Sequence, residues 1–181
     1  MSGPPANKGR RARPDAGDRA KNDALLAELD GLYAEVDARF AGWSCDSSTD
    51  CCHFGRTGRE PYVTTIELAA IERARARSGR KLGGSAPAVS KATAPKRSGD
   101  RRSLPIAKDE RRCPLLDDAG RCSIYDARPF GCRTFFCDRA LAGDKVTQRD
   151  INAYVSRIRD LAAGFGSGDA SGRPLTRAMG C

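Results

Sequence analysis

Seven of the eight cysteines form two groups whose spacing suits metal ligation. The downstream group places four cysteines within 25 residues, and the upstream group places one cysteine ahead of a vicinal pair. Thiolates bind zinc and iron-sulfur clusters, so a chain rich in thiols and short of large apolar side chains predicts a metal centre. The candidate ligands are Cys45, Cys51 and Cys52 upstream and Cys113, Cys122, Cys132 and Cys137 downstream.

The spacing of these cysteines bears on the identity of the metal. Structural zinc sites usually take paired Cys-x₂₋₄-Cys ligands, whereas this sequence holds no Cys-x-x-Cys, and its tightest non-vicinal spacing is Cys132-x₄-Cys137. An iron-sulfur centre is therefore favoured over a zinc or iron ion. If Cys51 and Cys52 lie in extended backbone, their side chains point to opposite sides and do not reach one ion together. Inert buried thiols and a redox-active dithiol remain the alternatives.

His53 is the sole histidine of the chain and follows Cys52 directly. Imidazole is a common metal ligand and carries protons near neutral pH, so His53 is a further candidate ligand. The alternative is a loop histidine that hydrogen-bonds to the backbone.

Two arginines, Arg128 and Arg133, flank Cys132. Guanidinium groups at these positions would compensate thiolate charge and donate hydrogen bonds to the sulfur atoms of a bound centre. The alternative is a structural salt bridge, to Asp126 or Asp138. The sequence leaves both interpretations open.

Three stretches have the periodicity of amphipathic helices that would position the cysteines. Residues 22–40 carry apolar residues at three- and four-residue intervals, residues 60–77 combine an extended segment with a helix, and residues 147–163 form a final helix. A turn at Asp117–Gly120 predicts a small β-hairpin. The expected helix caps are Asn22 or Asp23, Thr64 with Glu67, and Thr147 with Asp150.

Composition divides the chain into ordered and disordered parts. Residues 1–21 and 164–181 are poor in large apolar side chains, so we expect a disordered basic arm and a flexible tail. Residues 22–163 would form one small metal-stabilised domain, mainly α with the β-hairpin, interrupted by a flexible basic insertion at 78–103. The net charge of +9 comes from basic residues in 1–21 and 73–112.

Nothing in the sequence predicts a membrane or a secretory route. Its apolar runs fall short of the roughly 20 residues that span a bilayer, and the first residues lack the apolar core of a signal peptide. We therefore expect a soluble cytoplasmic protein, in which thiols stay reduced. The basic segments could attract nucleic acid or another acidic partner non-specifically, because they lack aromatic residues for base stacking.

The order and spacing of the cysteines also resemble a known family. Cys-x₅-Cys-Cys, then Cys-Pro-Leu-Leu, then Gly-x-Cys-Ser-Ile-Tyr-Asp-x-Arg-Pro-x-x-Cys-Arg-x-Phe is similar to the YkgJ-type cysteine-cluster family, over about residues 43–137 without the insertion. That family is described as zinc- or iron-chelating and is related to the cluster domain of flagellin lysine methylases. The resemblance implies that the metal ligands include Cys51, Cys52, Cys113, Cys122 and Cys132.

One interval departs from the family pattern. Many members carry an extra cysteine between the positions that match Cys45 and Cys51, where this chain has DSSTD. Either one ligand is lost or another residue replaces it. The candidates for a replacement are His53, Asp46, Asp50 and Cys137.

The sequence therefore predicts a metal-binding protein whose centre joins the two cysteine groups. Two alternatives remain: an oxidoreductase or methyl-transfer-related enzyme that uses the centre catalytically, and a zinc-stabilised module that binds nucleic acid or protein. The sequence assigns no catalytic residue, since it shows no phosphate-binding loop, dinucleotide fingerprint or Ser-His-Asp arrangement.

Overall fold

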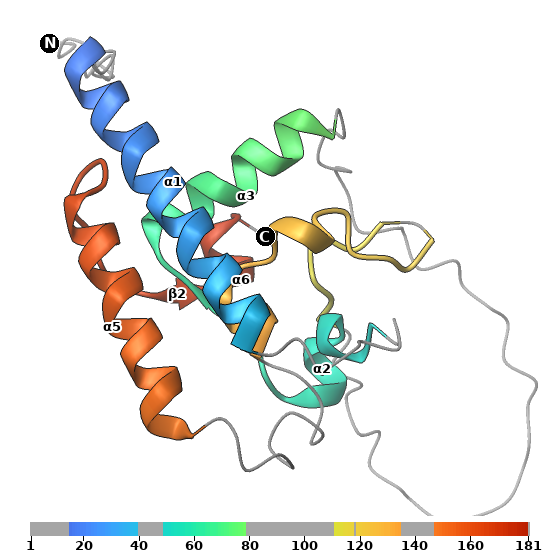
Figure 1. Cartoon of the computed structure of the whole chain (residues 1–181). Helices are drawn as coiled ribbons and strands as arrows, with labels where there is room; N and C mark the ends of the chain where they lie inside the picture. The colour runs from blue at the N-terminus through green and yellow to red at the C-terminus, as the bar shows by residue number, and fades with distance from the viewer. Residues whose placement is uncertain (1–14, 40–48, 79–110, 118, 135–146, 181) are drawn as a thin grey trace, which may run out of the picture.

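The structure is a computed structural model that describes residues 15–39, 49–78, 111–117, 119–134 and 147–180 (Figure 1). Within these ranges, no helix is both long and apolar enough to cross a membrane. The elements in chain order are α1 (Ala16–Arg39), the 3₁₀ turn η1 (Asp50–Cys52), α2 (Phe54–Thr57), β1 (Tyr62–Val63), α3 (Thr65–Arg77), the 3₁₀ turn η2 (Tyr125–Ala127), α4 (Phe130–Thr134), α5 (Gln148–Gly164), β2 (Arg173–Pro174) and α6 (Leu175–Ala178).

The fold is mainly α with a small antiparallel β element, as predicted. The expected hairpin forms as a tight turn between Leu115 and Ser123 that a single antiparallel bridge closes, from Leu116 to Cys122. Gly120 in this turn has a φ of 72°, a conformation that glycine adopts without a steric penalty. The basic insertion predicted at 78–103 lies outside the described residues, except for Ser78.

Helix α1 begins six residues earlier than the sequence pattern suggested. The carboxylate of Asp15 accepts a hydrogen bond of 2.8 Å from the backbone N–H of Asp18 and so supplies the N-terminal cap expected at Asn22 or Asp23. The last residues of the predicted disordered arm, Ala16 to Lys21, are therefore helical. The side chain of Asn22 instead accepts a hydrogen bond from the N–H of Gly166.

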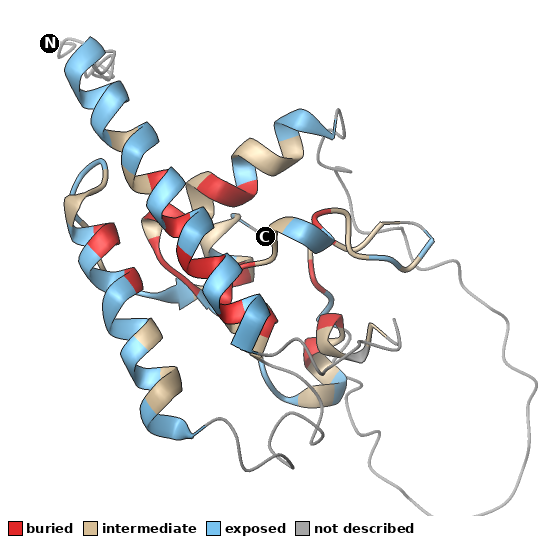
Figure 2. Cartoon of the chain, in the orientation of Figure 1, coloured by how far each residue is buried: buried red, intermediate tan, exposed pale blue. Residues whose placement is uncertain are grey.

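The main hydrophobic core lies between α1, α3 and α5. Helices α1 and α5 run antiparallel side by side, because Asn22 contacts Gly166 at one end and Arg39 pairs with Asp150 at the other (Figure 1). Figure 2 shows the buried residues of α1 on the side that faces the other helices. The cluster comprises Leu26, Leu29, Leu32, Tyr33, Val36, Ile66, Ala70, Phe130, Ile158, Leu161 and Ala162.

Both predicted capping boxes are confirmed, at Thr64 with Glu67 and at Thr147 with Asp150. The first has a role that its spacing did not reveal, because Glu67 is only 3% exposed. Its Oε2 accepts the Thr64 backbone N–H and hydroxyl, both at 2.9 Å, while its Oε1 accepts the Tyr33 hydroxyl and the Phe130 N–H, both at 3.0 Å. One carboxylate thus joins α1, α3 and α4.

The prediction of a flexible tail after residue 164 is wrong. Strand β2 pairs antiparallel with β1, with Tyr62 opposite Pro174 and Val63 opposite Arg173. Leu175 is fully buried in a second core cluster. The carboxylate of Glu60 holds the start of α6 through the N–H and hydroxyl of Thr176. The local sequence does not predict this ordered structure, because the partners Glu60, Tyr62 and Val63 lie more than a hundred positions away in the chain. Cys181 lies outside the described residues.

Candidate metal centre

The five described cysteines line a single cavity of about 260 Å³. They come from four places in the chain: η1, the residues before the turn, the second arm of the turn, and α4. Apolar side chains complete much of the wall, and Thr49, Arg121, Tyr125 and Arg128 add polar groups. The cysteines are Cys51, Cys52, Cys113, Cys122 and Cys132.

Backbone hydrogen bonds bring the two cysteine groups together. The N–H of Cys113 donates to the carbonyl of Cys52 at 2.8 Å, and the N–H of Gly55 donates to the carbonyl of Arg111 at 3.2 Å. These two bonds fasten the start of the downstream segment to the loop and helix that follow the vicinal pair. The upstream and downstream groups therefore form one site, although most of the chain between them belongs to other elements or lies outside the described residues.

The vicinal pair does not adopt the extended backbone on which the sequence argument depended. Asp50–Cys52 forms a 3₁₀ turn, and the sulfur atoms of Cys51 and Cys52 lie 4.0 Å apart. Two thiolates on a tetrahedral zinc ion, each with a bond of about 2.3 Å, lie roughly 3.8 Å apart. Both sulfur atoms can therefore reach the same ion or cluster, and the expectation that they point to opposite sides is corrected.

The turn and α4 position the remaining two thiols. The bridge from Leu116 to Cys122, together with bonds from the N–H and hydroxyl of Ser123 to the carbonyl of Leu115, fixes the second arm of the turn. Cys132 lies in the first turn of α4, where its N–H donates to the carbonyl of Pro129 at 2.9 Å. Phe130 packs into the main core and anchors the same helix. The residues that line the cavity are therefore anchored in both hydrophobic core clusters.

The thiols strongly influence each other's protonation. The hydrogen bond with Cys113 is the largest cause that raises the pKa of Cys52, to about 12, with burial contributing as well. Contact with Cys52 and then burial raise the pKa of Cys51, and burial followed by the neighbouring thiols raises the pKa of Cys132. Five thiolates cannot share this cavity without a cation, so metal binding there would release protons.

The donor set fits a thiophilic metal, but the sulfur atoms surround a volume and do not converge on one point. Among the residues that the structure describes, no three His, Cys, Asp or Glu side chains are grouped closely enough to hold a single ion. The cavity also exceeds the size of one ion. What the residues provide is a thiol-lined chamber of five soft donors with apolar walls.

The structure separates the two arginines that flank Cys132. Arg128 lines the cavity. Its charge opposes, without cancelling, the rise in pKa that contact with Cys52 and burial cause at Cys51 and that burial causes at Cys122 and Cys132. Its guanidinium stacks 3.8 Å above the ring of Tyr125, while its Nε donates to the carbonyl of the same residue. This stacked pair, which the sequence did not suggest, places a cation at the cavity wall.

Arg133 faces away from the cavity and has a structural role. It is 4% exposed, pairs with the carboxylate of Asp37, and donates to the carbonyls of Arg128 at 2.7 Å and Asp126 at 2.5 Å. Its guanidinium also lies 4.5 Å from the centre of the Tyr33 ring. Arg133 is therefore not part of the cavity wall, and its support of a metal centre stays a prediction. The alternative, a structural salt bridge, is present, with Asp37 as the partner in place of Asp126 or Asp138.

The other candidate ligands are less closely tied to the cavity. His53 precedes α2, where its carbonyl accepts hydrogen bonds from Arg56 and Thr57, and its side chain is not part of the described cavity wall. The side chain of Asp50 is not described. The predictions for Cys45, Asp46 and Cys137 fall outside the described residues.

A protein-family comparison adds an independent observation. Residues 44–152 match the family model "CxxCxxCC: putative zinc- or iron-chelating domain", which covers more than half of the chain and all seven candidate cysteines. When Cys45, Cys51 and Cys52 are aligned with that motif, Ser48 stands at its second cysteine. No curated protein and no solved structure matches the chain.

Proposed function

Because the chain belongs to the CxxCxxCC family, we propose that it is a metal-binding protein whose thiol-lined chamber holds the metal. The observation that carries the proposal is that five cysteines from four separate parts of the chain line one cavity. Buried thiols that serve only as small apolar residues have no reason to share a single chamber. The proposed ligands are Cys51, Cys52, Cys113, Cys122 and Cys132.

We favour an iron-sulfur centre as the occupant. Five described thiols exceed the four ligands of a closed zinc site, and they surround a chamber of about 260 Å³ without a three-donor group at one point. A group of several iron and sulfide atoms suits such a chamber better than one ion does. When bound, an iron-sulfur centre supplies reversible one-electron transfer, with a potential that depends on charge, hydrogen bonds and solvent exposure.

Several residues of this chain would serve such a centre without binding it. Arg128 compensates the negative charge of the thiolates from the cavity wall, and Tyr125 holds its guanidinium in place. Phe54, Leu115 and Ile124 are buried apolar residues of the cavity wall and would exclude water from the centre. The loaded site would also couple folding of the upstream and downstream segments to metal binding, because both supply thiolates.

Zinc is the second candidate, and one distance supports it. The 4.0 Å between the sulfur atoms of Cys51 and Cys52 is close to the edge of a tetrahedral zinc–thiolate site, roughly 3.8 Å. In this zinc alternative, Cys51, Cys52 and two of the downstream thiolates would hold one ion, and the fifth thiol would pack beside it. The zinc ion would then have a structural role in the protein.

Metal and sulfide analysis of the chain distinguishes these occupants. The full chain would be purified without oxygen, and its iron, zinc and acid-labile sulfide would be measured alongside an absorption spectrum. We expect iron and sulfide in equal amounts with thiolate-to-iron absorption in the visible range. One zinc per chain without sulfide would replace the iron-sulfur proposal with the zinc one. A chain without bound metal that also fails to bind added zinc or iron would refute both.

A further inference from the structure

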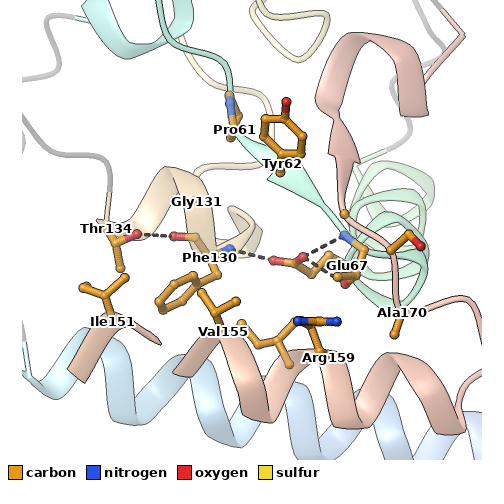
Figure 3. A pocket seen from close by; sticks show the side chains of 14 residues that line it. Pro61, Tyr62, Glu67, Phe130, Gly131, Thr134, Ile151, Val155, Arg159 and Ala170 are labelled. Carbon is orange, nitrogen blue, oxygen red and sulfur yellow. Dashed lines mark hydrogen bonds between the residues drawn. The ribbon is translucent and has the colours of Figure 1, made fainter. Parts of the chain in front are cut away.

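A second cavity, of about 510 Å³, lies against α4 next to the thiol-lined chamber. Phe130 and Gly131 face this pocket, whereas their neighbours Pro129 and Cys132 line the chamber. The pocket is bounded by α4, α5, β1 and the residues that precede β2, as Figure 3 shows. Its volume falls within the range of about 300–1,000 Å³ that is typical of small-molecule sites.

The walls of this pocket are mainly apolar. Ile151, Val155 and Ile158 of α5 face Phe130 of α4 and Pro61 of the segment before β1. Val155 and Tyr62 remain exposed at 39% and 63%, so apolar surface is open to solvent here. This lining favours an occupant with an apolar body.

Glu67 lies in the wall but offers nothing to a ligand. Its two oxygen atoms already accept four hydrogen bonds from Thr64, Tyr33 and Phe130, which matches the number of lone-pair positions on a carboxylate. A cationic ligand would therefore find no free acceptor on this residue. The deep part of the pocket behaves as an apolar surface.

The charged group that remains available in the lining is the guanidinium of Arg159. This side chain extends from α5 along the pocket, below Glu67 in the view of Figure 3. No carboxylate pairs with it among the residues that the structure describes, whereas Arg157, two positions earlier on the same helix, forms a two-bond pair with Glu35. A guanidinium presents paired N–H donors in the geometry of a carboxylate.

We propose that this pocket binds a small molecule with an apolar body and a single carboxylate, which Arg159 binds at the pocket edge. One exposed cation balances one negative charge, so a monocarboxylate fits better than a phosphate ester with two. The proposal goes beyond metal binding and does not depend on which metal the chamber holds.

Octanoate and octanol are suitable probes because they share an apolar chain and differ in the charged group. Binding to the full metal-loaded chain would be followed by calorimetry and by backbone amide NMR shifts. We expect saturable octanoate binding with shifts at Phe130, Gly131 and α5. Arg159→Gln should weaken octanoate by about tenfold while leaving octanol unchanged, since only octanoate loses a charge-assisted hydrogen bond.

Two further variants complete the test. Arg157→Gln removes the same charge from the same helix outside the pocket and should leave octanoate binding unchanged. Val155→Trp, at a position that is 39% exposed, should fill the pocket and abolish binding of both probes. The proposal is overturned if octanoate does not saturate, if both arginine variants weaken it equally, if binding survives Val155→Trp, or if sedimentation shows that a second copy of the chain covers the pocket.

Discussion

Replacing Glu67 with glutamine should destabilise the whole fold, because no orientation of the new amide satisfies its neighbours. The side chain is 3% exposed, and each carboxylate oxygen accepts one backbone N–H and one hydroxyl hydrogen. The hydroxyls of Tyr33 and Thr64 can turn and accept a hydrogen bond from an amide. The N–H groups of Phe130 and Thr64 cannot, so one of them loses its partner in either orientation.

The magnitude follows from that single orphaned donor. A buried N–H without a partner costs about 1–3 kcal/mol, and the loss of charge-assisted bonds adds to it, so we expect Glu67→Gln to cost about 2–4 kcal/mol. The N–H of Phe130 begins the helix that carries Cys132, so metal retention should also fall. Urea unfolding of the metal-loaded chain, followed by circular dichroism, measures the loss.

Asp150→Asn is the matched control for this substitution. Asp150 has the same capping-box geometry with Thr147 on α5, but its side chain is 38% exposed, so water replaces any partner that is lost. The loss of stability in Asp150→Asn should be a small fraction of the loss in Glu67→Gln. Equal losses in the two variants, or a Glu67→Gln chain as stable as the parent, would refute the reasoning.

Three further predictions concern the tail, the cavity wall and alkaline pH. Leu175→Ala should cost about 3–5 kcal/mol in urea unfolding, because Leu175 is fully buried, and a tail that did not pack would tolerate the change. Arg128→Gln should leave the helical content unchanged yet weaken metal affinity by about tenfold in a chelator competition, since it removes the guanidinium whose charge acts on the cavity thiols. Burial, and then the charge of Glu67, raise the pKa of Tyr33 in the folded chain. The protonated Tyr33 hydroxyl therefore contributes fully to the free energy of unfolding below the unfolded pKa of about 10, and this contribution is lost as pH rises above that value. Urea midpoints measured between pH 8 and 11 should therefore fall at the alkaline end, and less steeply in Tyr33→Phe.

The parts of the fold that the sequence predicted are those governed by local rules. Thr64 with Glu67 and Thr147 with Asp150 cap helices through bonds that span three residues, so their spacing alone identifies them. The apolar stripes of α1 and α5 likewise require no knowledge of the rest of the chain. Thiol density predicted one shared site, and five of the seven cysteines line one cavity in the structure, while the other two lie outside the described residues.

The incorrect predictions concern long-range pairing or backbone geometry. Leu175 looked like part of a polar tail because its burial depends on Val63 and Phe54, which are distant in sequence. Arg128 and Arg133 both flank Cys132 in the sequence, so which of them lines the cavity depends on the three-dimensional fold. The sulfur atoms of Cys51 and Cys52 approach each other because the backbone forms a 3₁₀ turn, which the residue types do not dictate.

The most direct test of a shared metal centre is differential alkylation of the thiols, read by mass spectrometry. The full chain would be treated with a cysteine-alkylating reagent in the metal-loaded state and after a chelator has removed the metal. We predict that metal protects Cys51, Cys52, Cys113, Cys122 and Cys132 together, and that removing it exposes all five at once. Protection of only the upstream pair or only the downstream three, or reactivity that does not depend on metal, would contradict a centre held by both groups.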